Sequence, residues 1–304
     1  MNPNSKKFHF FEKGVQAYKN YSGEETNNYC CPICGDHFSR TDLESGKLTL
    51  EHIPPKSQGG RGIALTCSSC NNKAGYTIDA AVANFEGIKK ISALGTKDGK
   101  YNDDIKLSLG EGKLNQLNFN LDITNGSQYF YIKPKSNPPN SKEIIKNFFE
   151  EHNKQPRGHI SQIRLETKRR YNHKLALVGY LKSAFLVCFA SFGYTYIFDT
   201  NLDAVRKQIQ NPVGNILDGY IIQINTGNLD RNVLMYSSNT LRLFLVVIRD
   251  TGVVLPLPSF MPHDDVHDLL RSTRPEKLEV RGKELEWPTS LLLKWDFRNS
   301  NDSA

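Results

Sequence analysis

Two pairs of cysteines share the spacing of a metal-binding knuckle. Each pair has two residues between its cysteines, and 32 residues separate the pairs; the members are Cys31, Cys34, Cys67 and Cys70. Four thiolates at this spacing match a tetrahedral structural zinc site, because each knuckle presents two sulfur ligands to one ion. Cys30 is a spare neighbour, since only Cys31 has the two-residue gap to Cys34. The sequence therefore predicts one structural Zn²⁺.

Three polar residues near these cysteines have the side chains that phosphodiester hydrolysis needs. Glu51 and His52 lie between the two pairs, and Asn71 directly follows the last cysteine. A carboxylate and an amide oxygen are hard ligands of the kind that Mg²⁺ or Mn²⁺ prefers. An imidazole with a pKa of about 6.5 accepts a proton from water at neutral pH. These residues are therefore the catalytic candidates, with Glu51 and Asn71 as ligands of a divalent ion that would stabilise the charged transition state.

The elements around these residues must bring them together. Residues 48–53 and 63–66 alternate as two strands, and the second cysteine pair opens a helix. We expect this order to gather Glu51, His52 and Asn71 across one small hairpin. Neighbouring strand residues face opposite sides, so the proline pair after His52 is expected to bend the strand and turn the imidazole toward water. The alternatives are that His52 caps a turn and that Asn71 caps the helix.

Three short segments carry these residues: CPICG, LTLEHIPPKSQGG and LTCSSCNNKAG, all in the N-terminal part of the chain. Together they resemble the HNH endonucleases, the ββα-metal nuclease family. The resemblance implies that His52 is the general base and that Asn71 and Glu51 bind the catalytic ion. Glu51 stands at the position where the family more usually has an aspartate. The resemblance also implies that the four cysteines clamp zinc. Gly62 or Ile63 stands where the family carries its middle asparagine.

Composition limits the class of protein. Hydrophobic residues make up 38% of the 304 residues, which excludes a polytopic membrane protein. The formal net charge of +7 favours a polyanion such as nucleic acid as partner. The N-terminal residues are polar, without the apolar stretch of a signal peptide, so we expect a cytoplasmic protein. Clustered cysteines in that reducing compartment favour a metal over disulfides.

Basic residues concentrate between residues 154 and 182, where the sequence has eight lysines and arginines and only one acidic residue, a glutamate. They are Lys154, Arg157, Arg164, Lys168, Arg169, Arg170, Lys174 and Lys182. Such a run could contact phosphates without reading sequence, or it could be a solvated face. From this run and from the module, the nucleic-acid-binding candidates are Lys56, Lys73, Lys168, Arg169 and Arg170.

The pattern along the chain predicts an α+β fold. We expect an amphipathic helix within residues 1–28, strands within 95–140, a helix at 141–152, a strand at 159–168, a long helix at 171–194, a helix at 201–210 and strands within 219–258. The long apolar helix contains a lysine and two glycines, which favours a buried helix over a membrane span. The expected domains are an HNH module at 1–92, with its core at 29–85, and a larger α+β domain at 93–304 for substrate binding or regulation.

The resulting hypothesis is a divalent-metal-dependent endonuclease that acts on DNA, with RNA left open as a substrate. A single site would nick one strand, whereas a homodimer would cut both. The resemblance also implies a bacterial restriction or phage-defence setting. Two alternatives remain: a zinc-stabilised nucleic-acid-binding module without catalysis, and an effector nuclease that a protein or small molecule gates through the C-terminal domain.

Overall fold

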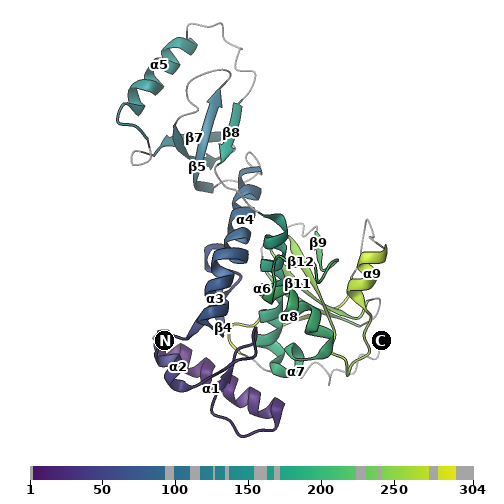
Figure 1. The fold of residues 1–304 in the computed structure, drawn as a ribbon. Helices are drawn as coiled ribbons and strands as arrows, with labels where there is room; N and C mark the ends of the chain where they lie inside the picture. The colour runs from purple at the N-terminus through teal and green to yellow at the C-terminus, as the bar shows by residue number, and fades with distance from the viewer. Residues whose placement is uncertain are drawn as a thin grey trace. The chain divides into compact units, whose positions relative to one another are not determined.

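The computed structural model describes most of the chain (Figure 1). The described residues are 3–92, 99–109, 117–125, 127–133, 137–153, 163–167, 172–223, 231–238, 241–273 and 280–291. The chain divides into two compact units, Met1–Ala83 with Asn172–Ala304 and, separately, Asn84–Tyr171. These limits differ from the boundary expected between residues 92 and 93. That boundary divides the chain by function, into a nuclease module and a binding or regulatory domain, and it stays a prediction.

The first unit begins with the predicted amphipathic helix and a small module of short strands and helices that carries the four cysteines. Its elements are α1 (Pro3–Ser22), β1 (Tyr29–Cys30), β2 (His37–Phe38), α2 (Arg40–Glu44), β3 (Leu48–Ile53), η1 (Lys56–Gln58), β4 (Arg61–Cys67) and α3 (Ser68–Ala74). Strands β3 and β4 pair antiparallel, with Leu48 opposite Cys67. The predicted order of strand, loop, strand and helix is therefore present.

The helix that follows the hairpin changes its winding partway along. Helix α3 continues through a π-helical turn, η2 (Gly75–Asp79), into α4 (Ala80–Ser92). A π turn inserts an extra residue per turn and is often found at functional sites, because it redirects the side chains around it. Asp79 stands at the end of this turn.

A long apolar helix forms the core of the first unit. Helix α6 (His173–Phe192) begins at Asn172, whose side chain accepts a hydrogen bond from the Leu175 N–H, and every residue from Val178 to Phe192 is buried. It packs against β3, β4, η2, β11 and β12. Among the described residues it is the one helix long and apolar enough to cross a membrane, and most of it lies inside the protein. This burial agrees with the predicted core helix.

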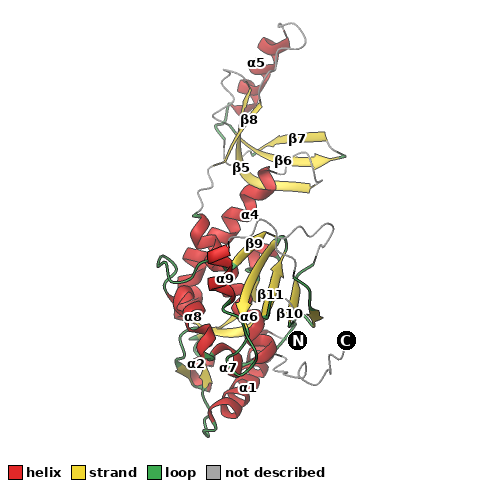
Figure 2. Ribbon diagram, turned by 90° about the vertical axis from the view of Figure 1, so that its right-hand side faces the viewer, coloured by secondary structure: helices red, strands yellow, loops and turns green. Residues whose placement is uncertain are grey.

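The C-terminal part of the first unit is an antiparallel sheet covered by helices (Figure 2). Its strands are β9 (Ile221–Gln223), β10 (Val233–Ser237), β11 (Leu243–Ile248), β12 (Thr251–Pro256) and β13 (Lys283–Leu285), in the order β13-β10-β11-β12-β9. Helices α7 (Tyr194–Ile197), η5 (Thr200–Leu202) and α8 (Asp203–Gln210) precede it, and α9 (Val266–Thr273) follows β12. Phe244 stacks on Phe192 of α6, whereas Leu245 packs with Leu270 of α9. Both faces of β11 are therefore buried.

The second unit is a smaller sheet with one described helix of its own, α5 (Ser141–Asn153). Its strands are β5 (Gly99–Leu109), β6 (Asn118–Thr124), β7 (Ser127–Ile132) and β8 (Ile163–Thr167), in the antiparallel order β7-β6-β5-β8. Asn125 adopts a positive φ of 52° between β6 and β7. The described elements confirm the α+β fold class.

Candidate functional site

The four predicted cysteines converge on one point. Two come from the turn after β1 and two from the junction of β4 with α3, and all four sulfur atoms lie within 4.8 Å of one another; they are Cys31, Cys34, Cys67 and Cys70. The backbone N–H of Cys67 donates to the Cys31 sulfur at 3.4 Å, and that of Cys70 donates to the Cys67 sulfur at 3.4 Å. Convergent sulfur donors with N–H support fit a structural Zn²⁺.

Local backbone geometry explains the first knuckle. Gly35 has a φ of 81°, in the left-handed region that favours glycine, and its N–H donates to the Cys31 carbonyl at 2.9 Å. The Cys30 thiol points elsewhere, toward the Gly35 carbonyl at 3.3 Å, and burial raises its pKa to about 12. His37 is exposed and packs edge-on against Tyr18. Neither Cys30 nor His37 belongs to the cysteine cluster, and the spacing predicted this for Cys30.

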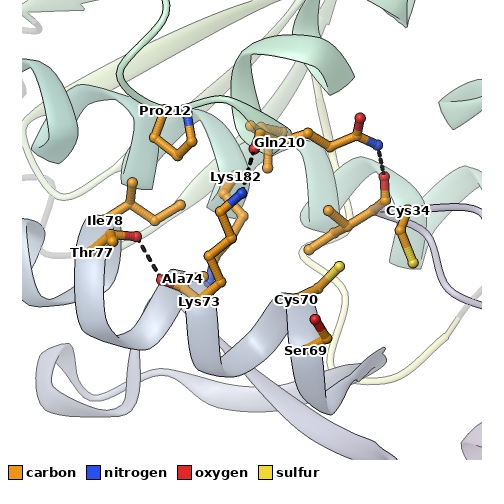
Figure 3. A pocket seen from close by; sticks show the side chains of 12 residues that line it. Cys34, Ser69, Cys70, Lys73, Ala74, Thr77, Ile78, Lys182, Gln210 and Pro212 are labelled. Carbon is orange, nitrogen blue, oxygen red and sulfur yellow. Dashed lines mark hydrogen bonds between the residues drawn. The ribbon is translucent and has the colours of Figure 1, made fainter.

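A cavity of about 290 Å³ opens beside the second knuckle (Figure 3). Lys73 crosses it and donates from Nζ to the Gln210 carbonyl at 2.9 Å, while the Gln210 amide donates to the Ile33 carbonyl at 2.6 Å. These two bonds tie α3 and the zinc knuckle to α8. The predicted phosphate-binding Lys73 therefore has a partner within the protein.

Asn71 lies within the first turns of α3 and faces the hairpin. Its amide nitrogen donates to Thr49 Oγ1 at 2.7 Å. The N-cap of α3 is instead Cys67, whose sulfur accepts the Cys70 N–H, so the capping alternative does not describe Asn71. Thr49 and Glu51 are two residues apart on β3 and share a strand face. Asn71 and Glu51 are therefore brought to the same side of the hairpin.

Glu51 is buried at 3% exposure and has protein partners for both carboxylate oxygens. Oε1 lies 2.7 Å from Lys182 Nζ of α6, and Oε2 accepts from Thr66 Oγ1 at 3.3 Å. The same Nζ lies 2.7 Å from Asp79 Oδ2. Burial would lower the pKa of Lys182, but the two carboxylates raise it above its usual value, so the ammonium stays charged. Burial raises the pKa of Glu51, which Lys182 partly offsets.

His52 is half-buried and lies within β3, before the strand ends at Ile53. The pairing register with β4 shifts between Glu51 and His52, because Ile63 is an extra residue opposite this step. The irregularity beside His52 is this register shift, and the expected bend at the prolines, which would turn the imidazole toward water, stays a prediction. Burial, and next the Lys56 ammonium, lower the His52 pKa, so the imidazole is neutral at pH 7. Within the described residues, no hydrogen bond joins His52 to Glu51 or Asn71.

The predicted nucleic-acid contacts fare differently from one another. Lys56 is exposed in η1. Lys168, Arg169 and Arg170 lie outside the described residues, as do Lys154 and Arg157, and of Arg164 only the strand is described. The interpretation of Lys182 as part of this basic run is wrong. Its side chain is 1% exposed and lies in an ion-pair cluster with Glu51 and Asp79, so it is not available to phosphate. Nucleic-acid binding by the other predicted residues stays a prediction.

The family model described as HNH endonuclease matches residues 31–77. Residues 31–77 are an HNH endonuclease domain. The match spans all four cysteines together with Glu51, His52 and Asn71, and it ends before Asp79. No curated protein and no solved structure matches the chain in the other two comparisons.

The expected catalytic ion does not fit the Glu51 side chain as the HNH domain is arranged here. Both carboxylate oxygens accept hydrogen bonds from the protein, and one of the donors is the charged Lys182 ammonium. A divalent ion bound directly to Glu51 would lie beside that ammonium in a buried site, where like charges repel strongly. The ligand pair of Glu51 and Asn71 thus stays a prediction that the contacts of Glu51 do not favour.

Sequence reasoning missed two partners of the HNH domain, Lys182 and Asp79. One signal for Lys182 was present: it is the single charged residue in the apolar stretch from 175 to 198, and lysines that are fully buried are nearly always paired. Its partner could not be read from the chain, because Glu51 and Lys182 are 131 residues apart. Asp79 carried no comparable signal.

Proposed function

We propose that this chain is an endonuclease that hydrolyses phosphodiester bonds in DNA through its HNH domain. The observation that carries the proposal is the family match over residues 31–77, which implies a nucleic-acid substrate. The neutral, half-buried imidazole of His52 within that domain supports it, and so does the net charge of +7. The bacterial defence setting, the cytoplasmic location, the homodimer and a regulatory partner stay predictions.

His52 is the proposed general base. Its neutral ring takes a proton from a water molecule, the resulting hydroxide attacks phosphorus, and the bond from phosphorus to the leaving oxygen breaks. The leaving oxygen then takes a proton from solvent, and His52 returns its own proton to solvent. The exposed Lys56, three residues beyond the end of β3, is the proposed contact to a non-bridging phosphate oxygen.

The divalent ion of the proposal, Mg²⁺ or Mn²⁺, rests on the HNH family and not on the contacts of this chain. Because both oxygens of Glu51 are already partnered, no chemical step is assigned to the ion. The structural Zn²⁺ has a different role: it would hold the first knuckle against the start of α3, and so position the hairpin that carries His52.

A plasmid assay tests the proposal. The zinc-loaded full chain is incubated with supercoiled plasmid and Mg²⁺ or Mn²⁺, beside His52→Ala and the matched control His37→Ala, an exposed histidine of the same domain. We expect the wild type and His37→Ala to produce nicked circles and His52→Ala to produce none. Equal nicking by His52→Ala would overturn the assignment of the base, and cleavage of single-stranded RNA alone would change the substrate class.

A second candidate function is a zinc-stabilised nucleic-acid-binding module without catalysis. The observation that favours it is the Glu51 carboxylate held by Lys182 at 2.7 Å. For this candidate the plasmid stays supercoiled with every divalent ion, while the chain still retards DNA in a gel, with an affinity that falls as salt rises.

A further inference from the structure

An internal ammonium stands at the carboxylate to which the HNH resemblance assigns a metal ion. Lys182 Nζ lies 2.7 Å from Glu51 Oε1 and 2.7 Å from Asp79 Oδ2. The three residues come from α6, β3 and the π turn η2, all in the first unit. Glu51 and Lys182 are 3% and 1% exposed, and the side chain of Asp79 is 15% exposed.

Backbone packing places the lysine there. Gly179 lies one turn before Lys182, and a Cβ at this position would come within 2.4 Å of Val82 Cγ2 and 2.8 Å of the Ile78 carbonyl oxygen. The missing side chain therefore lets α6 approach the helix that carries Asp79. Because the π turn ends at Asp79, the same close approach brings both carboxylates within reach of one ammonium.

The charges of the cluster do not cancel. Two carboxylates and one ammonium carry a net charge of −1 when all are ionised. The second oxygen of Asp79, Oδ1, is buried and has no hydrogen-bond partner among the described residues. Without Lys182, this cluster would offer a divalent ion two carboxylates in a buried place. With Lys182, the position between the carboxylates is already held by a cation.

We infer that Lys182 competes with a divalent cation for Glu51, so that the HNH domain of this chain binds Mg²⁺ or Mn²⁺ weakly at its hairpin. An ion coordinated by a carboxylate oxygen lies about 2.1 Å from it, and the ammonium lies 2.7 Å from Oε1, so both cations would share one small buried space. The inference rests on the proposed function and refines its metal requirement. Because its test measures ion binding without DNA, failure of the inference can be distinguished from failure of the proposed nuclease activity.

The test is a Mn²⁺ titration of the zinc-loaded full chain, followed by the electron paramagnetic resonance signal of free Mn²⁺. Mn²⁺ is the probe because it competes poorly with Zn²⁺ for thiolates. We expect no tight site in the wild type. We expect Lys182→Met, which keeps an unbranched side chain one atom shorter and removes its charge, to gain one site at least about tenfold tighter. Adding Glu51→Gln to that variant should abolish the gain.

The matched control is Lys174→Met, which removes an exposed lysine from the same helix and should leave Mn²⁺ binding unchanged. Circular dichroism and zinc content report whether each variant folds. If Lys182→Met does not fold, the double variant Lys182→Met/Asp79→Asn leaves one unpaired carboxylate instead of two and keeps Glu51 as a ligand. Unchanged Mn²⁺ affinity in a folded variant without Lys182 would overturn the inference.

The wild type also provides a test that needs no lysine variant. A tight Mn²⁺ site in the wild-type chain that Glu51→Gln removes would show that Glu51 binds a divalent ion beside Lys182, and it would overturn the inference. Weak Mn²⁺ binding by the wild type, unchanged in Glu51→Gln, would support it.

Discussion

Two polar clusters at the HNH domain differ in whether the chain itself supplies a positive charge to them. In the cysteine cluster, four sulfur atoms converge within 4.8 Å, and among the described residues no lysine or arginine is hydrogen-bonded to them. In the ion-pair cluster of Glu51, Lys182 and Asp79, two carboxylates converge on an ammonium of the chain itself. The inferred competition by Lys182 means that donor type alone does not define a metal site; the donors must also be left without an internal cation.

The cysteine cluster should carry the larger share of the stability of the domain. Cys67→Ser removes one zinc ligand, whereas the serine hydroxyl can still cap α3 in place of the sulfur, so we expect the loss of bound zinc itself to unfold the hairpin. Zinc content and thermal unfolding measure this. Cys30→Ser is the control, because its thiol lies outside the cluster, and it should keep one zinc per chain. A Cys67→Ser variant with full zinc and unchanged unfolding would contradict the predicted ligand set.

Removal of the internal cation should have the next largest effect. Lys182→Met leaves Glu51 and Asp79 unpaired and buried, so we expect the free energy of unfolding to fall by about 3–5 kcal/mol in urea titrations. Burial already raises the pKa of Glu51, and without Lys182 that pKa rises further. The folded variant then binds protons more readily than the unfolded chain, so its loss of stability should shrink as pH falls below 7.

A neutral version of the same cluster separates the charges from the packing. Glu51→Gln/Lys182→Met/Asp79→Asn removes all three charges, and we expect it to regain most of the stability lost in Lys182→Met. Equal instability of the single and the triple variant would mean that the shape of the Lys182 side chain, rather than its charge, holds α6 against the hairpin.

The close approach of α6 is a smaller and more local test. Gly179→Ala places a methyl group 2.4 Å from Val82 Cγ2 and 2.8 Å from the Ile78 carbonyl oxygen, so we expect a loss of about 1–3 kcal/mol in unfolding free energy. Ala184→Gly at a buried position of the same helix is the reference for helix propensity plus the loss of one buried methyl group, with an expected cost of about 2 kcal/mol. A neutral Gly179→Ala would argue against a tight contact that builds the ion-pair cluster.

The smallest expected effect concerns the base itself. Burial and the Lys56 ammonium hold the His52 pKa below its usual value of about 6.5. The rate of nicking should therefore rise with pH as His52 loses its proton, with its midpoint below pH 6.5, and then level off. Lys56→Met removes a nearby positive charge and should move this midpoint upward by a fraction of a pH unit. A downward move would contradict the electrostatic account of His52.

The two clusters also differ in how far the sequence could predict them. The cysteine ligands lie in one segment, and the order of strand, loop, strand and helix around them follows from alternation and turn residues between Tyr29 and Asn71. The burial of α6 likewise follows from a local feature, the apolar composition of that stretch of sequence. These features depend on neighbours along the chain.

The ion-pair cluster depends on contacts across the fold. Lys182 was counted with a basic run because charge was summed along the sequence, whereas its side chain joins Glu51, 131 residues away. The π turn that ends at Asp79 and the register shift beside His52 are set by packing, and no residue pattern in the sequence marks them.

The metal content of the wild-type chain tests this comparison most directly. The protein is equilibrated with both Zn²⁺ and Mn²⁺, passed through a desalting column and examined by elemental analysis. The account predicts one zinc per chain, held by the cysteines, and no retained manganese, because Lys182 holds Glu51. One zinc together with one manganese per chain, with the manganese absent from Glu51→Gln, would contradict it.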